Sequence, residues 1–121
     1  MAYDEDLAER IRELVAREKV TESKMFGGLA FLVGGNMAVA ASGQGGILVR
    51  VDPDESERLT RGGAAAPMVM RGKAMAGWLR VDADRLRTKA QLRRWVDVGV
   101  TYARSLPPKA ARKKASGTRS R

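Results

Sequence analysis

The sequence predicts an α+β domain: a mostly antiparallel sheet of about five strands, a meander plus a hairpin, flanked by helices at its amino and carboxyl ends. Short apolar runs alternate with glycine pairs over residues 25–51, as in a meander of antiparallel strands. Methionine-rich runs on either side of Gly72 predict a further hairpin. Amphipathic stretches with capping residues precede and follow these runs, which predicts the flanking helices.

The amino-terminal segment has the pattern of an amphipathic helix that packs by one side. Asp4 is placed to cap this helix, because an aspartate side chain accepts a hydrogen bond from a backbone N–H of the first turn. The charged residues lie largely away from the apolar face. The apolar positions on that face are Leu7, Ile11, Leu14 and Val15.

The glycine-rich stretch that follows is interpreted as a three-stranded meander. Residues 29–33 and 37–41 are two short apolar runs. Gly34 and Gly35 between them tolerate the positive φ angles of a tight hairpin turn. After a second glycine-rich turn, residues 47–52 alternate with the period of two that is typical of a strand with one buried face.

A membrane span and a phosphate-binding loop are the two alternative interpretations of this stretch. No charged residue lies between Lys24 and Arg50, a gap long enough to span a bilayer, but its repeated glycines disfavour a continuous helix. A phosphate-binding loop needs either lysine and a hydroxyl residue after its last glycine or the glycine spacing of a dinucleotide turn, and the stretch has neither pattern. We therefore expect a hairpin and no membrane span.

A short helix and the second hairpin come next. Asp52 as capping carboxylate and Pro53 at the first helical position predict a helix start, and Gly62 marks its end. Residues 68–71 and 75–81 then form the two arms of the hairpin. We expect the methionines of these arms to fill the core rather than to form a binding surface.

A carboxyl-terminal helix closes the predicted domain. Thr88 and Gln91 have the spacing of a capping box at its start, and the prolines from Pro107 onward end it. Its apolar face consists of Leu92, Trp95, Val96, Gly99, Ala103 and Leu106.

The positive charge is concentrated at the carboxyl end. Residues 107–121 contain no acidic residue and hold +6 of the formal net charge of +9. The cations are Lys109, Arg112, Lys113, Lys114, Arg119 and Arg121. The segment has no aliphatic residue larger than alanine, so we predict a domain over residues 1–106 followed by a disordered basic tail. The tail either serves solubility or contacts nucleic acid weakly and non-specifically through phosphates.

The composition restricts the chemistry that the domain can perform. The chain has no cysteine and no histidine, which excludes thiolate nucleophiles and the common zinc sites. Asp52 and Asp54 are candidate magnesium ligands, but helix capping accounts for them. We therefore expect no catalytic residue, no metal and no cofactor. The amino terminus lacks the basic start and apolar core of a secretory signal, so we expect a cytoplasmic protein.

Several residues give the chain a resemblance to a known family. They are Lys24, Met25, Phe26, Gly27, Gly28, Gly35, Met75, Gly77 and Trp78. With the strand that ends at Asp52 and the tryptophan-containing last helix, they make residues 5–106 resemble the amino-terminal domain of the TfoX/Sxy family, here as a stand-alone domain. The resemblance implies a mostly antiparallel sheet with helices packed on it, and a mainly structural role for these residues.

Two-domain members of that family are positive regulators of natural competence genes, working with a global DNA-binding activator, and the family supplies no established catalytic residues. The resemblance therefore implies a small non-catalytic regulatory or adaptor module, in a transcription- or competence-related context. We expect it to bind a protein partner or a second copy of itself. The alternative is a small enzyme with a carboxylate or lysine site. A deep polar pocket would favour the enzyme, and an apolar patch the module.

Overall fold

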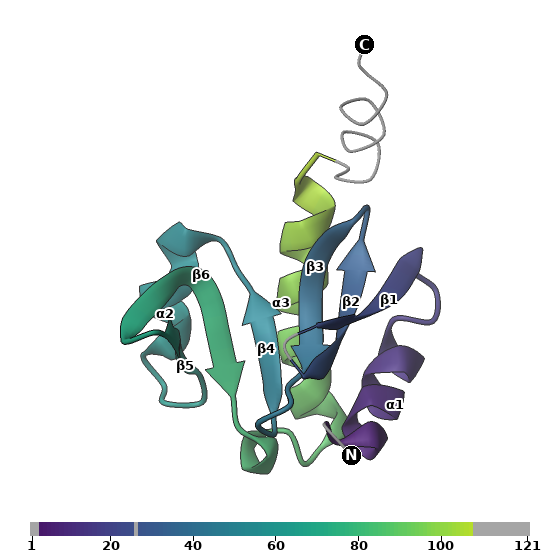
Figure 1. The fold of residues 1–121 in the computed structure, drawn as a ribbon, viewed down its shortest axis with the longest axis horizontal. Helices are drawn as coiled ribbons and strands as arrows, with labels where there is room; N and C mark the ends of the chain where they lie inside the picture. The colour runs from purple at the N-terminus through teal and green to yellow at the C-terminus, as the bar shows by residue number, and fades with distance from the viewer. Residues whose placement is uncertain (1–2, 26, 108–121) are drawn as a thin grey trace.

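The computed structural model describes residues 3–25 and 27–107 (Figure 1). The predicted basic tail lies outside the described residues, apart from Pro107. In chain order the elements are α1 (Glu5–Leu14), β1 (Val20–Met25), β2 (Gly28–Val33), β3 (Asn36–Ala41), β4 (Ile47–Arg50), η1 (Pro53–Glu55), α2 (Ser56–Thr60), β5 (Ala66–Met70), β6 (Lys73–Val81), η2 (Ala83–Arg85) and α3 (Lys89–Ser105).

The strands of the described residues form one antiparallel sheet in the order β1-β2-β3-β4-β6-β5. The first four strands follow one another as a meander, then β6 pairs with β4 and β5 takes the outer edge. The segment between β4 and β5 carries η1 and α2, which lie beside the β5–β6 hairpin (Figure 1). The predicted α+β fold, an antiparallel sheet with helices at both ends, is confirmed.

The predicted strand count is wrong, because the described part of the chain holds six strands rather than five. The additional strand is β1, whose sequence VTESKM is mostly polar and lacks the alternating apolar signal of a half-buried strand. It forms by backbone pairing with β2, beginning with Val20 opposite Val33. Arg12 of α1 donates hydrogen bonds of 2.6 and 2.9 Å to Glu22 of β1, and these bonds lower the pKa of the Glu22 carboxyl. A polar edge strand of this kind protects the sheet from further pairing.

The main core lies between the sheet and the two longer helices, α1 and α3 (Figure 1). The apolar faces predicted for these helices are buried in it, with Leu14 and Leu106 half-buried. The largest side chains that are fully buried are Trp95, Phe31, Ile11, Ile47, Leu79, Leu86 and Leu92. Burial of this surface is the main source of the domain's stability.

Helix α3 approaches the sheet closely at Gly99. A Cβ atom at this position would lie 2.2 Å from the backbone oxygen of Ala38, far inside van der Waals contact. Ala38 lies at a bulge, where the register between β2 and β3 shifts between Phe31 and Leu32. The missing side chain of Gly99 therefore sets the distance between α3 and β3.

The opposite face of the sheet carries a smaller apolar cluster. Its buried members are Ala30, Met37, Ala40 and Leu48, and Leu32, Met68 and Trp78 pack partly against them. Met68 thus follows the prediction that the methionines of the second hairpin fill core. The prediction is wrong for Met75, which is 37% exposed on β6.

Local capping signals begin the helices as predicted. Asp4 accepts a hydrogen bond of 3.1 Å from the backbone N–H of Leu7. Thr88 and Gln91 form the predicted capping box, each side chain accepting from the other's backbone N–H at 3.0 Å. The helix predicted after Asp52 is present as two short pieces. The 3-10 helix η1 comes first and is followed directly by α2, which ends at Thr60.

The predicted hairpin turn joins β2 to β3. Gly34 and Gly35 have φ angles of 60° and 82°, both in the left-handed region that favours glycine. The membrane-span alternative required a continuous helix here, and the structure has strands instead. Among the described residues, no helix is both long enough and apolar enough to cross a bilayer.

Replacing Gly35 by valine is expected to lower the free energy of unfolding by about 1 to 3 kcal/mol, because a β-branched residue is strained at positive φ. Chemical denaturation of the two chains measures the difference. The matched control is Gly62→Val, at a glycine with no neighbouring atom within 4 Å and no positive φ. Equal unfolding midpoints for Gly35→Val and the unaltered chain would contradict the turn's contribution.

Candidate functional site

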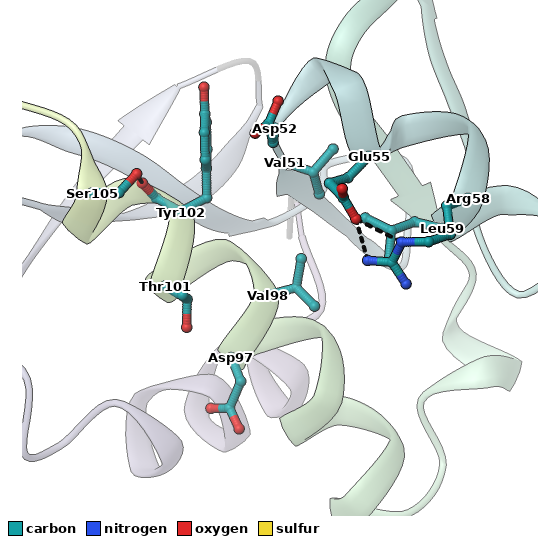
Figure 2. A pocket seen from close by; sticks show the side chains of 10 residues that line it. All are labelled: Val51, Asp52, Glu55, Arg58, Leu59, Asp97, Val98, Thr101, Tyr102 and Ser105. Atoms are coloured by element: carbon teal, nitrogen blue, oxygen red, sulfur yellow. Dashed lines mark hydrogen bonds and ion pairs between the residues drawn. The ribbon is translucent and has the colours of Figure 1, made fainter.

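A surface groove of about 440 Å³ lies between α3 on one side and η1 with α2 on the other (Figure 2). It is open to solvent rather than enclosed. The lining residues are Val51, Asp52, Glu55, Arg58, Leu59, Asp97, Val98, Thr101, Tyr102 and Ser105. The groove therefore combines two segments that are about 50 residues apart in the chain. The first of them begins at Val51, directly after β4.

The floor of the groove is apolar. Val51 and Leu59 are buried and Val98 is half-buried. Figure 2 shows Val51 and Val98 facing one another across the groove. The backbone N–H of Val51 donates a 2.8 Å hydrogen bond to the carbonyl of Gly77, which anchors this end of β4 to β6. The floor is thus built on the rigid sheet and on the helix that covers it.

The rim of the groove carries carboxylates, two of which are neutralised by neighbouring arginines. Arg58 donates a 2.6 Å hydrogen bond to Glu55, and Arg93 lies 3.9 Å from Asp97. The carboxylate of Asp52 accepts a 2.9 Å hydrogen bond from the backbone of η1, and it forms no ion pair with any described residue. No group of three or more acidic side chains in the described residues is placed to hold a metal ion.

Next to the groove, an arginine lies near two aromatic rings. The guanidinium carbon of Arg50 lies 5.5 Å from the ring centroid of Trp78 and 5.8 Å from that of Tyr102. Both distances fall within the range of cation–π attraction. Arg50 ends β4 directly opposite Trp78 of β6, whereas Tyr102 comes from α3 and also lines the groove. Tyr102 therefore connects the arginine to the groove.

A second hollow, of about 290 Å³, lies near the β3–β4 turn. Its lining residues are Ser42, Gln44, Leu48, Met68, Val69, Arg71 and Arg80. Arg80 donates hydrogen bonds of 3.2 Å to the Ser42 hydroxyl and 3.0 Å to the Gly45 carbonyl. Because its donors hold this turn in place, Arg80 has a structural role.

The residues quoted for the family resemblance are spread over the sheet. Lys24 and Met25 end β1, Gly27 and Gly28 lead into β2, Gly35 lies in the next turn, and Met75, Gly77 and Trp78 belong to β6. Of these, Trp78 contacts Arg50 beside the groove. Phe26 and the basic tail residues Lys109, Arg112, Lys113, Lys114, Arg119 and Arg121 lie outside the described residues, so their predicted roles stay predictions.

Sequence reasoning missed the residues that give this site its character. Arg50 was noted only as the end of an uncharged stretch, and Tyr102 was not singled out. In the sequence, Arg50 stands out only as a cation at the end of an apolar strand. Tyr102 stands out only as a tyrosine beside the apolar face of α3. Neither signal shows that the two side chains meet.

Comparison with known protein families identifies the family of this domain. A family model described as the TfoX N-terminal domain matches residues 12–103 of the 121-residue chain. The chain belongs to this family. The match covers the whole sheet of the TfoX N-terminal domain and every residue that lines the groove except Ser105. No curated protein matches the chain.

Proposed function

We propose that this TfoX N-terminal domain is a small non-catalytic regulatory or adaptor module of the cytoplasm, and that it binds a protein partner in the groove between α2 and α3. The observation that carries the proposal is the open groove with an apolar floor and a polar rim. Protein interfaces have this arrangement, in which a dry apolar centre supplies most of the affinity. The family resemblance suggests a transcription- or competence-related context.

The alternative is a small enzyme that uses a carboxylate or lysine. The groove is large enough for a small molecule. Its lining contains no lysine, however, and Glu55 and Asp97 stand beside arginines on the exposed rim. Catalytic carboxylates are usually held in a cleft that excludes water, whereas these two face solvent. The arrangement therefore supports binding better than catalysis.

The groove is tested by filling it. Thr101 is an exposed residue of α3 that lines the groove, and we expect Thr101→Trp to abolish partner binding by occupying the space over the floor. The measurement is quantitative capture of proteins from the native cell extract by the full chain and by the variant. Sedimentation of the purified chain shows whether the partner is a second copy.

Ala90→Trp is the matched control, because it places the same side chain at an exposed position of α3 outside the groove. The proposal requires that a protein retained by the unaltered chain and by Ala90→Trp is lost with Thr101→Trp. Equal retention by both variants would locate binding elsewhere. Turnover of a small molecule that Thr101→Trp abolishes would favour the enzyme.

The basic tail adds a second, weaker interaction in this proposal. Its cations attract nucleic acid through phosphates without reading sequence, because electrostatic contact with the backbone carries no base information. Such attraction would raise the local concentration of the module near DNA, while the groove selects its protein partner.

A further inference from the structure

We propose that Arg50, which lies within cation–π range of both Trp78 and Tyr102, binds an aspartate or glutamate side chain of the partner, next to an apolar side chain that enters the groove. This inference rests on the proposed function, which it deepens by stating the chemistry of the partner. It assigns the groove an acidic–apolar peptide segment. The argument rests on the geometry of Arg50, on the charges around it and on its continuity with the groove.

The guanidinium of Arg50 is held in place but its hydrogen-bond donors are free. Arg50 is half-buried, and its guanidinium carbon lies within cation–π range of two rings, which restricts where the side chain can go. Among the described residues it has no hydrogen-bond acceptor and no carboxylate partner. None of its nitrogens is both buried and unpartnered, so they reach solvent. The donors are therefore available to a ligand.

Other arginines of the domain show the contrast. Arg80, two residues further along β6 than Trp78, uses its donors on the β3–β4 turn. Arg10 of α1 donates to the backbone carbonyl of Leu86 at 2.7 Å. Those guanidiniums have structural roles, whereas Arg50 lies beside two aromatic rings and has no acceptor within the described part of the chain. An arginine fixed before binding loses little side-chain entropy when it pairs with a ligand.

The surrounding charges favour a single carboxylate over a phosphate. One free guanidinium matches one carboxylate, which it binds in a bidentate pair. A phosphate, with a second negative charge, or a nucleic-acid backbone would also meet the carboxylate of Asp52, which has no ion-pair partner among the described residues. We therefore assign a protein side chain to Arg50, and leave nucleic acid to the tail.

The groove supplies the second half of the recognition. Tyr102 lies within cation–π range of Arg50 and lines the groove, so a peptide paired with Arg50 can extend over the apolar floor of Val51, Leu59 and Val98. Because the groove is open rather than enclosed, it suits an internal segment of a partner better than a buried chain end. A large apolar side chain beside the acidic residue would bury the floor.

The experiment selects displayed random peptides on the immobilised full chain and measures the affinity of the enriched sequences as synthetic, terminally blocked peptides. We expect enrichment of an acidic residue adjacent to a large apolar one. Arg50→Met, which keeps an unbranched apolar stem but loses the charge, should weaken binding about ten- to hundredfold. Arg94→Met is the matched control, since the guanidinium carbon of Arg94 also lies near a tryptophan ring, 5.0 Å from the centroid of Trp95, but Trp95 does not line the groove as Tyr102 does.

A change in the peptide alone tests the pair without altering the protein's folding. In the peptide, aspartate is replaced by asparagine, or glutamate by glutamine. This change should weaken binding to the unaltered chain as much as Arg50→Met weakens binding of the original peptide. Binding to the Arg50→Met chain should be weakened little further by the changed peptide. Equal affinity of the unaltered chain and Arg50→Met would overturn the proposal, as would enriched peptides without an acidic residue. If Thr101→Trp nevertheless abolishes binding of those peptides, the proposal that the groove binds a partner is still supported. Failure to enrich any peptide would count against both.

Discussion

Replacing Trp95 by alanine is expected to lower the free energy of unfolding by about 3 to 5 kcal/mol, the usual cost of removing a large aromatic side chain from a packed core. Trp95 is 2% exposed and lies in the main core between α3 and the sheet. A domain of ordinary stability, about 5 to 15 kcal/mol, would lose a large part of its margin. Chemical denaturation followed by far-ultraviolet circular dichroism measures the change.

The control for this prediction is the neighbouring residue of the same helix. Arg94 is exposed and its main contact is with the Trp95 ring, so Arg94→Ala should change the free energy of unfolding by no more than about 1 kcal/mol. Trp95→Phe should fall between the two, because phenylalanine leaves a smaller cavity than alanine. A loss below about 1 kcal/mol for Trp95→Ala would show that Trp95 does not organise the core as its burial indicates.

The parts of the fold that sequence predicts well are those with local causes. The Asp4 cap and the box of Thr88 with Gln91 depend on atoms a few residues apart, so the pattern alone identifies them. The same holds for the Gly34–Gly35 turn, where the required backbone angles suit glycine. The apolar faces of α1 and α3 were likewise predicted because burial of a helix follows its 3.6-residue period.

The parts that sequence misses depend on the assembled structure. Strand β1 is held by pairing with β2, and its polar side chains give no periodic signal. Gly99 was placed on the apolar face of α3, but its role depends on the position of the Ala38 backbone oxygen in another element. Such contacts exist only after the chain has folded.

The candidate site belongs entirely to this second class. Arg50 and Tyr102 are about 50 residues apart in the chain, and their contact depends on how α3 crosses the sheet beside β4. The groove likewise needs α2 to be held against β6. Sequence could limit the available chemistry, through the absence of cysteine and histidine, but it could not position the residues that remain.

The basic tail is expected to produce a steep salt dependence of DNA binding. If all six tail cations meet phosphates, the slope of log affinity against log salt should approach roughly −5, about a thousandfold loss between roughly 50 and 200 mM salt. The remaining chain carries only +3 of the net charge of +9, so it should add little. Fluorescence anisotropy of unrelated labelled duplexes at several salt concentrations measures the slope.

Two altered chains separate the tail from the domain in this measurement. A chain ending at Leu106 removes the tail but also the Pro107 carbonyl, which accepts a 2.8 Å hydrogen bond from the Asn36 side chain. A full-length chain with all six tail cations changed to glutamine keeps that bond and is the better control. Both should bind DNA weakly with a shallow slope, because counterion release scales with the number of phosphates neutralised. Unchanged affinity in the glutamine chain would place DNA binding in the domain, and a strong preference for one duplex would require a base-reading element there.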